Sequence, residues 1–179
     1  MRAYKTEGIV IKRKNFGEAD RIITIFTKKH GKIQVKATGV RRITSRRSSH
    51  IELLNYGIFN LHRGRSLPVL TEVQSLETFY KLKNNLAKIG YAYHVCELVD
   101  GLCAENQESF EIFMLLGRTL RRISLESNLK EIVRDFELNL LRLLGFYTAS
   151  QNLNFNTQNF IENILERKLK SKQILLQLS

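Results

Sequence analysis

Cysteine and long apolar runs are both scarce in this sequence, and each scarcity excludes a class of protein. The 179 residues contain two cysteines, Cys96 and Cys103, which cannot by themselves form a disulfide framework or a zinc site. No apolar run approaches the roughly 18 residues needed to cross a bilayer. The first fourteen residues contain only three consecutive branched apolar residues, Ile9 to Ile11. We therefore expect no signal peptide and no membrane anchor, and a location in the cytosol.

Patterns typical of catalytic sites are also missing. The sequence has no Gly-x-Ser-x-Gly, His-Glu-x-x-His, Walker-type or dinucleotide-binding glycine pattern. The four histidines fall in four different predicted elements without the spacing of metal ligands. Glu18 and Asp20 could serve acid–base chemistry, but their place beside Arg21 at a loop-to-strand junction favours a structural turn with a local ion pair. We expect no enzyme active site, no metal and no cofactor.

Positive charge is what the sequence has in excess, and it is concentrated in one half. There are 29 Lys and Arg against 17 Asp and Glu, a net charge of +12. Residues 1–80 hold 16 basic and 6 acidic side chains, whereas residues 81–179 hold 13 and 11. With 43% hydrophobic and 26% charged residues, the chain is globular. A one-sided basic half is typical of a module that binds a polyanion.

The apolar residues up to about residue 77 repeat with the two-residue period of β-strands. A Gly-containing hairpin loop is expected at residues 28–31, and an arginine-rich loop follows Gly39. The predicted strands cover residues 8–13, 21–27, 32–38, 51–62 and 69–76. Five short strands that need no connecting helix predict a small closed barrel, for which the OB-fold is the leading candidate.

From Phe79 on, the apolar residues follow the period of helices. One stripe contains Leu82, Leu86, Ile89, Tyr93, Cys96 and Cys103, and the two cysteines are expected to be buried as small hydrophobic residues. A second helix begins after Ser109 as N-cap, and a third, residues 129–144, ends at Gly145. A polar loop at residues 147–158 and a weaker helix at 159–178 follow. The predicted fold class is α+β: an OB-fold barrel over residues 1–78, then an all-α helical domain over residues 79–179.

The candidate residues for contact with a nucleic-acid backbone are the basic side chains of the barrel, to which single-strand binders add aromatic platforms. Any one of them could be an ordinary solvated charge, but 14 Lys and Arg against 3 acids in the first 50 residues is a specific signal. Phe16 and Tyr56 could stack on bases, although core packing is favoured for both. The residues expected at the interface are Lys12, Arg13, Lys14, Phe16, Arg21, Lys32, Lys36, Arg41, Arg42, Arg46, Arg47, Arg63 and Arg65.

Several sequence blocks resemble those of a known family. Residues 6–11, 17–24, 26–27, 30–32 and 39–42 are similar to the N-terminal signature of the bacterial DNA repair protein family RecO. Residues 136–138 with 140–146 are similar to that family's late helix motif, a leucine-rich segment that is weak by itself. The detailed matches cover about a third of the chain, and the order of the domains covers nearly all of it.

The resemblance implies a non-enzymatic protein with an N-terminal OB-fold and a helical domain. Members bind single- and double-stranded DNA, anneal complementary strands, and act with RecR to help RecA replace single-stranded-DNA-binding protein. Such a protein would work in the cytoplasm at the nucleoid. The helical domain receives the acidic, Phe-terminated tail of single-stranded-DNA-binding protein. Arg118, Arg121 and Arg122 share one helix face and are candidates for that contact; favourable charge near a helix C-terminus is the alternative.

The sequence departs from the family pattern in one place. Many members carry a four-cysteine zinc site soon after the Leu-Leu-Gly motif, but residues 147–154 and those after them contain no Cys or His. Zinc is therefore not expected, and the C-terminal part looks reduced. Two other classes stay open: an RNA-binding OB-fold factor, and a protein adaptor that acts mainly through its helical domain.

Overall fold

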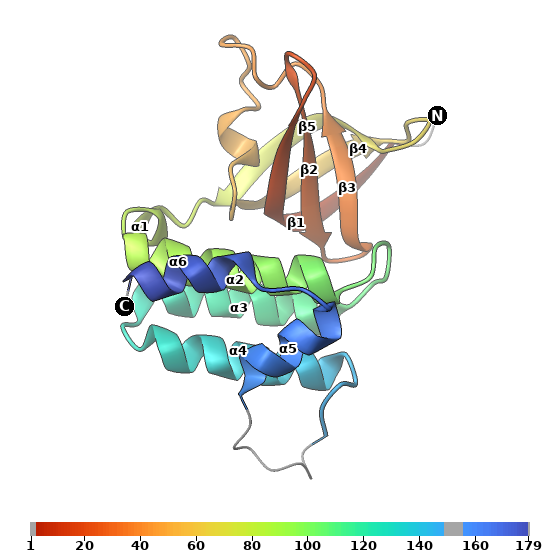
Figure 1. Cartoon of the computed structure of the whole chain (residues 1–179). Coiled ribbons are helices and arrows are strands. Elements are labelled where there is room, and N and C mark those ends of the chain that lie inside the picture. Colours follow the sequence, from red (N-terminus) through yellow and green to blue (C-terminus); the bar gives the residue numbers. More distant parts are fainter. Residues whose placement is uncertain (1–2, 149–155, 179) are drawn as a thin grey trace. The chain divides into compact units, whose positions relative to one another are not determined.

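The computed structural model of the chain describes residues 3–148 and 156–178, which form two compact units (Figure 1). The barrel unit contains the described residues up to Thr78 together with Ala104–Phe113. The helical unit contains Phe79–Cys103 and the described residues from Met114 onward. The predicted α+β class, with the barrel first, is confirmed. The domain boundary after residue 78 stays a prediction, because close packing is not the same as independent folding.

Five strands close the barrel in the order β1-β2-β3-β5-β4, the arrangement of an OB-fold. A short 3₁₀ helix, η1 (Ser49–Ile51), lies between β3 and β4. Neighbouring strands are antiparallel except β3 and β5, which are parallel and meet at Lys36 and Val69. The strands are β1 (Ala3–Phe16), β2 (Asp20–Thr27), β3 (Gly31–Ala37), β4 (Tyr56–His62) and β5 (Val69–Glu77).

Strand β1 is longer than the sequence pattern predicts because it pairs with two partners. Its first half pairs with β4 and its second half with β2, and the register with β2 shifts between Val10 and Lys12. Such a bulge bends and twists a strand, which lets β1 pass from one partner to the other. At Gly8, which pairs with both neighbours, a Cβ atom would collide with the side chain of Ile25. The bulge and the glycine therefore allow the barrel to close.

The predicted strand at residues 51–62 is wrong in its first half. Residues 49–55 turn instead, because Asn55 Nδ2 donates to the carbonyl oxygens of Ser49 (2.9 Å) and His50 (3.2 Å). Leu54 lies in the left-handed region, with φ of 73°. The backbone of this turn bonds to β1 at its bulge, where Leu54 N donates to Val10 O at 2.8 Å.

Apolar side chains from all five strands fill the barrel interior. Burial of these side chains stabilises the fold by about 1.5–3 kcal/mol each. The buried cluster consists of Val10, Ile23, Ile25, Ile33, Val35, Ala37, Val40, Ile51, Phe59, Leu61 and Leu70.

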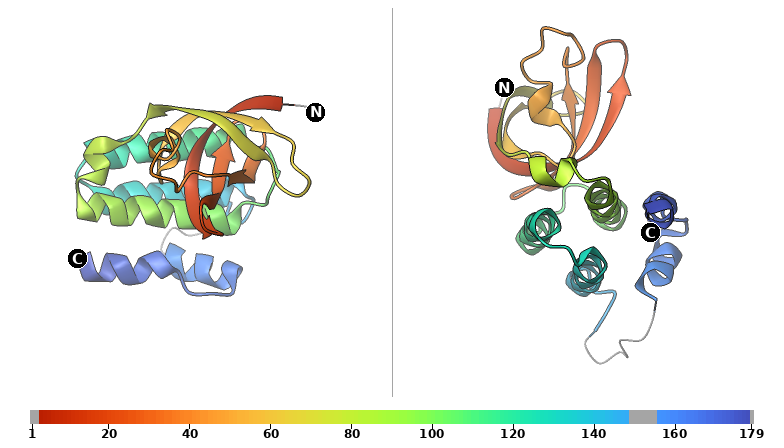
Figure 2. Two further views of the ribbon diagram at one scale, coloured as in Figure 1. Left: turned by 90° about the horizontal axis from the view of Figure 1, so that it is seen from above. Right: turned by 90° about the vertical axis from the view of Figure 1, so that its left-hand side faces the viewer.

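The helical unit holds its helices in layers, with α5 and α6 running beside the others (Figure 2). The predicted caps are confirmed: Ser109 Oγ accepts from Ile112 N at 3.3 Å, and Gly145 has φ of 79°. Both cysteines are buried, as expected. The helices are α1 (Tyr80–Lys83), α2 (Leu86–Leu102), α3 (Phe110–Leu125), α4 (Leu129–Leu143), α5 (Thr157–Leu165) and α6 (Lys170–Leu178).

Two helix predictions are wrong in detail. Leu86 is 68% exposed although it belongs to the predicted buried stripe, whereas Ala92 and Val95 outside that stripe are buried. Helix α2 contacts both α4 and α6, so its buried apolar residues lie on more than one face of the helix. The single last helix is two helices, α5 and α6, separated where Glu166 takes φ of 53°. Residues 149–155 of the predicted polar loop lie outside the described residues.

Candidate nucleic-acid interface

Two loops of the barrel unit join to form one basic rim. The turn between β1 and β2 meets the loop after β3, residues 38–48, which we call the arginine loop. Asp20 Oδ1 accepts from Gly39 N at 2.8 Å, and Arg41 N donates to Ala19 O at 2.9 Å. The guanidinium of Arg41 donates to Gly17 O at 2.9 Å. The predicted turn at Gly17–Asp20 is confirmed, and its function is to hold the arginine loop.

The sequence predicts a local ion pair between this turn and the neighbouring Arg21, but the partner of Asp20 is another residue. Asp20 pairs with Lys36 at 3.2 Å, while Arg21 lies near Glu52 at 3.8 Å. The hydrogen bond from Gly39 N, followed by that from Lys36, lowers the pKa of Asp20 below its usual value. Asp20 therefore stays ionised at neutral pH and keeps the two loops together. This contribution is lost as the pH falls through the lowered pKa.

Phe16 is exposed on the rim rather than packed in the core. Its side chain is 48% exposed, and Lys36 Nζ lies 5.2 Å from the centre of its ring, a distance typical of a cation–π contact. Core packing, which the sequence favoured, is therefore wrong for Phe16. Tyr56 is half-buried: its hydroxyl donates to Glu7 at 2.6 Å, and its ring centre is 6.2 Å from that of Phe113.

Arg47 fixes the base of the arginine loop to the barrel. Its guanidinium donates to Thr38 O and to Leu70 O, both at 2.8 Å, and its side chain is half-buried. Arg41, Arg42 and Arg46 are exposed on the same loop. Arg47 thus holds the base of the loop, whereas the other three arginines are exposed, Arg41 with one bond to Gly17 O.

The remaining basic residues of the barrel occupy three environments. Arg13 pairs with Glu52 at 2.6 Å, so Arg13 and Arg21 share one carboxylate and keep a net positive charge. Lys12 and Lys14 on β1 and Arg63 and Arg65 between β4 and β5 are exposed. Beside the arginine loop, a hollow of about 350 Å³ is lined by Lys5, Arg46, Arg47, His50 and Glu72 among others.

Lys32 does not project into solvent as the strand alternation predicts. It is 7% exposed, and it forms an isolated bridge with Glu105. The backbone of Asn106 donates to Lys32 O at 2.8 Å, and Gln34 bonds to Glu105. Residues 104–113 therefore line this part of β3. The sequence gives no sign of this contact, because it joins residues some 70 positions apart.

The helical unit offers basic residues on α3 and at a hollow. Arg118 and Arg121 are exposed on α3, but Arg122 is engaged with Glu126 (3.0 Å) and Asp135 (3.3 Å). A second surface is a hollow of about 640 Å³. It combines basic and apolar side chains, and its lining includes Tyr91, Lys130, Val133, Arg134, Lys172, Leu175 and Leu176.

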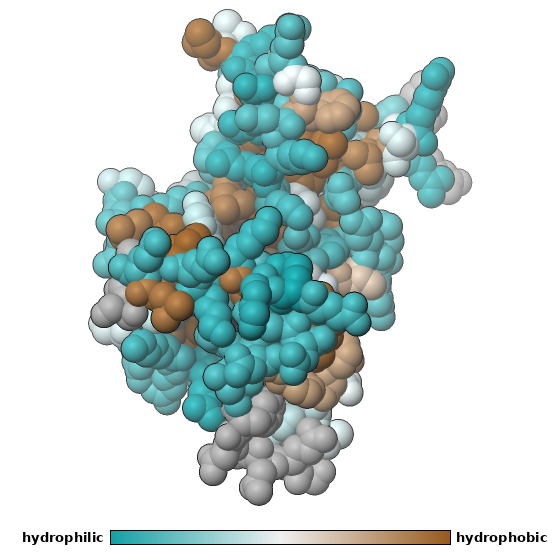
Figure 3. All heavy atoms as spheres, viewed as in Figure 1, coloured by the Kyte–Doolittle hydropathy of each residue, from teal (hydrophilic) through white to brown (hydrophobic). Residues whose placement is uncertain are grey.

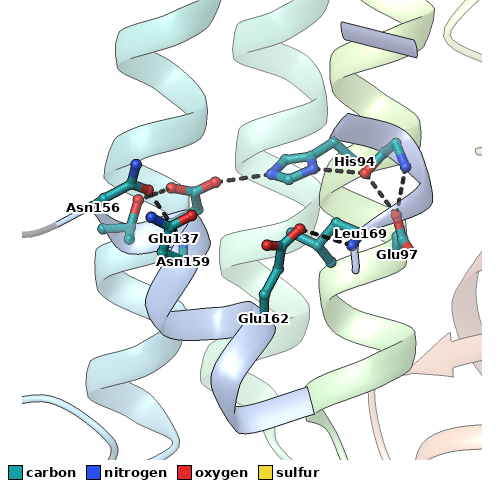
Figure 4. Close-up of polar contacts among 9 residues, drawn as sticks. His94, Glu97, Glu137, Asn156, Asn159, Glu162 and Leu169 are labelled. Atoms are coloured by element: carbon teal, nitrogen blue, oxygen red, sulfur yellow. Dashed lines mark hydrogen bonds and ion pairs between the residues drawn. The ribbon is translucent and has the colours of Figure 1, made fainter. Parts of the chain in front are cut away.

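A buried polar network in the helical unit was not predicted (Figure 4). His94 contacts Ser171 Oγ through Nδ1 and Glu137 Oε1 through Nε2, both at 2.8 Å. Ser171 Oγ donates to Glu97 and Thr157 donates to Glu137. Because Ser171 Oγ donates to Glu97, it accepts from Nδ1 of His94, and Nε2 on the other side of the ring is paired with the Glu137 carboxyl. The network joins α2, α4, α5 and α6.

Glu97 is the second carboxylate of this network. Burial favours its neutral form, but hydrogen bonds from Arg167 and Ser171 outweigh burial and lower the pKa of Glu97 to about 2. By contrast, burial raises the pKa of the Cys96 thiol to about 12, so this thiol is not a reactive nucleophile at neutral pH. These polar and sulfur groups serve the packing of the helices.

Over residues 3–148 and 156–178, no helix has the length and apolar composition to cross a membrane. Within the same ranges, no cluster of three or more His, Cys, Asp or Glu side chains is placed to bind a metal ion.

Comparison with known proteins identifies the family. The family model for the N-terminal domain, described as "Recombination protein O N terminal", matches residues 1–79. The family model described as "Recombination protein O C terminal" matches residues 83–153. The chain belongs to the RecO family. The family resemblance of the N-terminal blocks and the late helix motif is confirmed, and so is the fold class that it implied.

Individual RecO relatives, each called DNA repair protein RecO, match most of this chain. The relative from Roseiflexus sp. strain RS-1 is 40% identical over 145 residues, which are 81% of this chain and 51% of the relative. Those from Alkaliphilus metalliredigens and Acetivibrio thermocellus are each 39% identical, over 79% and 82% of this chain and 58% and 59% of their own lengths. The chain thus spans between half and six tenths of these relatives.

The structure brings together only part of the site expected for this RecO chain. Phe16, Lys36, Arg41 and Arg42 meet around Asp20, and Arg46 extends from the same loop. Arg47 holds the loop, Arg13 and Arg21 share Glu52, and Lys32 is buried. Sequence reasoning missed the holding function of Asp20, although its place in the Gly-Glu-Ala-Asp turn was a signal.

Replacing Asp20 with alanine is expected to loosen the arginine loop. The variant loses an acceptor for Gly39 N, and a charge-assisted hydrogen bond contributes about 1.5–3 kcal/mol. Trypsin should therefore cleave the full chain after Arg41, Arg42 or Arg46 about tenfold faster. Glu18→Ala removes an exposed carboxylate from the same turn and is the matched control. Equal cleavage rates in the two variants would show that Asp20 does not hold the loop.

Proposed function

We propose that this chain binds single- and double-stranded DNA through the basic rim of its barrel and anneals complementary strands. The observation that carries the proposal is the anchored arginine loop, on which Arg41, Arg42 and Arg46 are exposed while Arg47 fixes the base. Guanidinium groups form strong bidentate contacts with phosphates. A loop that is already ordered loses little conformational entropy when it binds.

The rim and the neighbouring residues have different parts in this proposal. Lys14, Arg41, Arg42 and Arg46 contact phosphates, and Phe16 offers its exposed ring to a base. The other basic residues act through the potential of the barrel or at a second phosphate track along the hollow near Arg46. They are Lys12, Arg13, Arg21, Lys36, Arg63 and Arg65; Lys32 and Arg47 contribute through the structure of the strand and the loop.

Annealing follows from charge and needs no enzymatic chemistry. Two DNA strands repel each other, and a broad basic surface screens that repulsion while it holds both strands. The protein does not have to read sequence, because base pairing between the strands supplies the selectivity. In this proposal one strand lies on the rim and the other passes along the hollow beside it, where Lys5 and Arg46 are the basic side chains that support it.

Protein partners complete the proposed repair function. We propose that the chain acts with RecR to help RecA replace single-stranded-DNA-binding protein, in the cytoplasm at the nucleoid. The relatives that it matches are called DNA repair proteins, which supports this setting. For the acidic, Phe-terminated tail of single-stranded-DNA-binding protein, Arg118 and Arg121 are the exposed members of the predicted trio. The hollow with Lys130, Arg134 and Lys172 offers basic and apolar groups together.

The test is annealing of complementary strands precoated with the cognate single-stranded-DNA-binding protein, with and without its acidic tail. The full chain should accelerate annealing, and removal of the tail should slow the reaction about tenfold. Arg118→Ala with Arg121→Ala and Lys130→Ala with Arg134→Ala tell the two helical surfaces apart. Absence of acceleration on uncoated strands contradicts the DNA proposal; equal rates with and without the tail contradict the tail proposal.

The same assay decides between the rival classes. An RNA-binding factor would bind matched RNA strands more tightly than DNA and would not accelerate DNA annealing. A protein adaptor would lose function with the helical variants and be unaffected by changes at the rim. All variants are made in the full chain, because residues 104–113 belong to the barrel unit.

A further inference from the structure

The tip of the arginine loop carries a fully exposed apolar side chain. Ile43 has a relative exposure of 105%, the highest among the large apolar residues of the described chain. Figure 3 shows hydrophobic atoms projecting at the end of the barrel that carries this loop, with hydrophilic surface around them. Exposing an isoleucine forgoes the about 1.5–3 kcal/mol that its burial would contribute. A side chain in this position is suited to burial against a ligand.

The loop holds this side chain outward rather than leaving it free to fold back. Arg42 N donates to Gly39 O at 3.2 Å, and Ser45 N donates to Arg42 O at 2.9 Å, so two turns follow each other at the tip. The bonds from Gly39 to Asp20 and from Arg47 to Thr38 and Leu70 fix the loop on both sides of the tip. Ile43 is thus the apex of an anchored element.

The neighbours of Ile43 determine which ligand it suits. Arg41 and Arg42 precede it, Arg46 follows three residues later, and all three are exposed. An acidic protein surface would satisfy the arginines but offers no regular apolar gap between its charges. A nucleic-acid strand offers both: phosphates at regular spacing and, between them, the apolar faces of stacked bases. Proteins that unstack DNA insert apolar side chains of this kind between base steps.

We infer that Ile43 inserts between adjacent bases of the DNA strand that Arg41, Arg42 and Arg46 hold by its phosphates. This inference rests on the proposed DNA binding and adds a contact with the bases. The inserted side chain separates two stacked bases and packs against their faces. Because every base offers such a face, the contact does not depend on sequence.

The experiment compares Ile43→Ala with the unchanged full chain on two probes. The first is a single strand that contains 2-aminopurine, whose fluorescence rises when its neighbours unstack. The second is a strand of equal length made of abasic sites, which keeps the phosphates and lacks the bases. The unchanged chain should raise the fluorescence. Ile43→Ala should abolish that rise and bind the base-containing strand roughly fivefold more weakly, with no change on the abasic strand.

Ile43→Leu is the matched control, because it keeps an apolar side chain of the same size and should keep the fluorescence rise. Equal weakening by Ile43→Ala on both probes would mean that Ile43 only supports the loop, which overturns the inference. An unchanged fluorescence rise with Ile43→Ala also overturns it. The proposed function fails separately, if the unchanged chain binds neither probe.

Discussion

Replacing Arg41 and Arg42 together with glutamate is expected to weaken binding of single-stranded DNA by about 10- to 100-fold at low salt. If the protein contacts about five phosphates, the slope of log affinity against log salt is about −3.5. Loss of two contacts should flatten this slope to about −2. Both side chains are exposed on an anchored loop, so the change removes charge and the bond from Arg41 to Gly17 O but no buried side chain. Fluorescence anisotropy at several salt concentrations measures both quantities.

The matched control for this experiment is Arg118→Glu with Arg121→Glu. These arginines are also exposed, on α3 of the helical unit, and the control changes the net charge by the same amount. If the two double variants lose equal affinity, total charge rather than the arginine loop determines binding. Unchanged affinity and slope for the Arg41 and Arg42 variant would remove the loop from the interface.

Replacing His94 with leucine should lower the free energy of unfolding by about 3–5 kcal/mol. The change leaves the Glu137 carboxyl, which is 2% exposed, without its hydrogen bond to His94 Nε2. Removing one member of a buried polar pair is more costly than replacing both, because the remaining polar group is left unpaired. The loss should be visible in urea unfolding followed by circular dichroism, as an earlier transition of the helical signal.

Two further variants separate the polar contact from simple packing. Glu137→Gln keeps an acceptor for the hydrogen bond from Thr157 and places an amide beside His94 in place of the carboxyl, so its cost should be about 1–2 kcal/mol. Combining His94→Leu with Glu137→Leu should recover part of the loss of the single change. A cost below about 1 kcal/mol for His94→Leu, or no recovery in the double variant, contradicts a stabilising contact between His94 and Glu137.

The barrel was largely predictable because its signals are local in the sequence. Alternating apolar residues, a Gly-containing hairpin loop and the absence of helical segments follow from strand geometry itself. The missing half of the 51–62 strand had no such signal: a single side chain, Asn55, closes the turn through bonds to Ser49 and His50. A polar residue inside an apolar segment is compatible with a continuous strand and also with a turn.

The sequence predicted that the basic residues of the barrel form a group, but it did not predict the function of each one. Arg46 and Arg47 are neighbours in the same loop, yet one is exposed and the other donates to three backbone carbonyls. Two of those carbonyls, of Leu70 and Thr71, belong to β5 and the third, of Thr38, follows β3, so the difference depends on tertiary structure. The same holds for Lys32 and Lys36, which share one strand face in the sequence pattern but meet Glu105 and Asp20 respectively.

The buried network around His94 had no sequence signal at all. Its members come from residues 94, 97, 137, 157 and 171, and each residue type is common on exposed helix surfaces. Only the packing of α5 and α6 against α2 and α4 makes them buried partners. Periodicity identifies apolar faces, and it does not identify polar groups that are satisfied across helices.

The contact between Gly31 and Gln107 has a consequence for the order in which the chain folds. Gly31 has φ of 62°, and a Cβ atom there would overlap the backbone of Gln107. During synthesis all five strands leave the ribosome before this part of the chain exists, because α1 and α2 come between them. Until residues 104–113 have been synthesised, the part of β3 around Lys32 stays uncovered in the nascent barrel. A pause in translation within α2 would thus prolong the exposure of that strand to other chains.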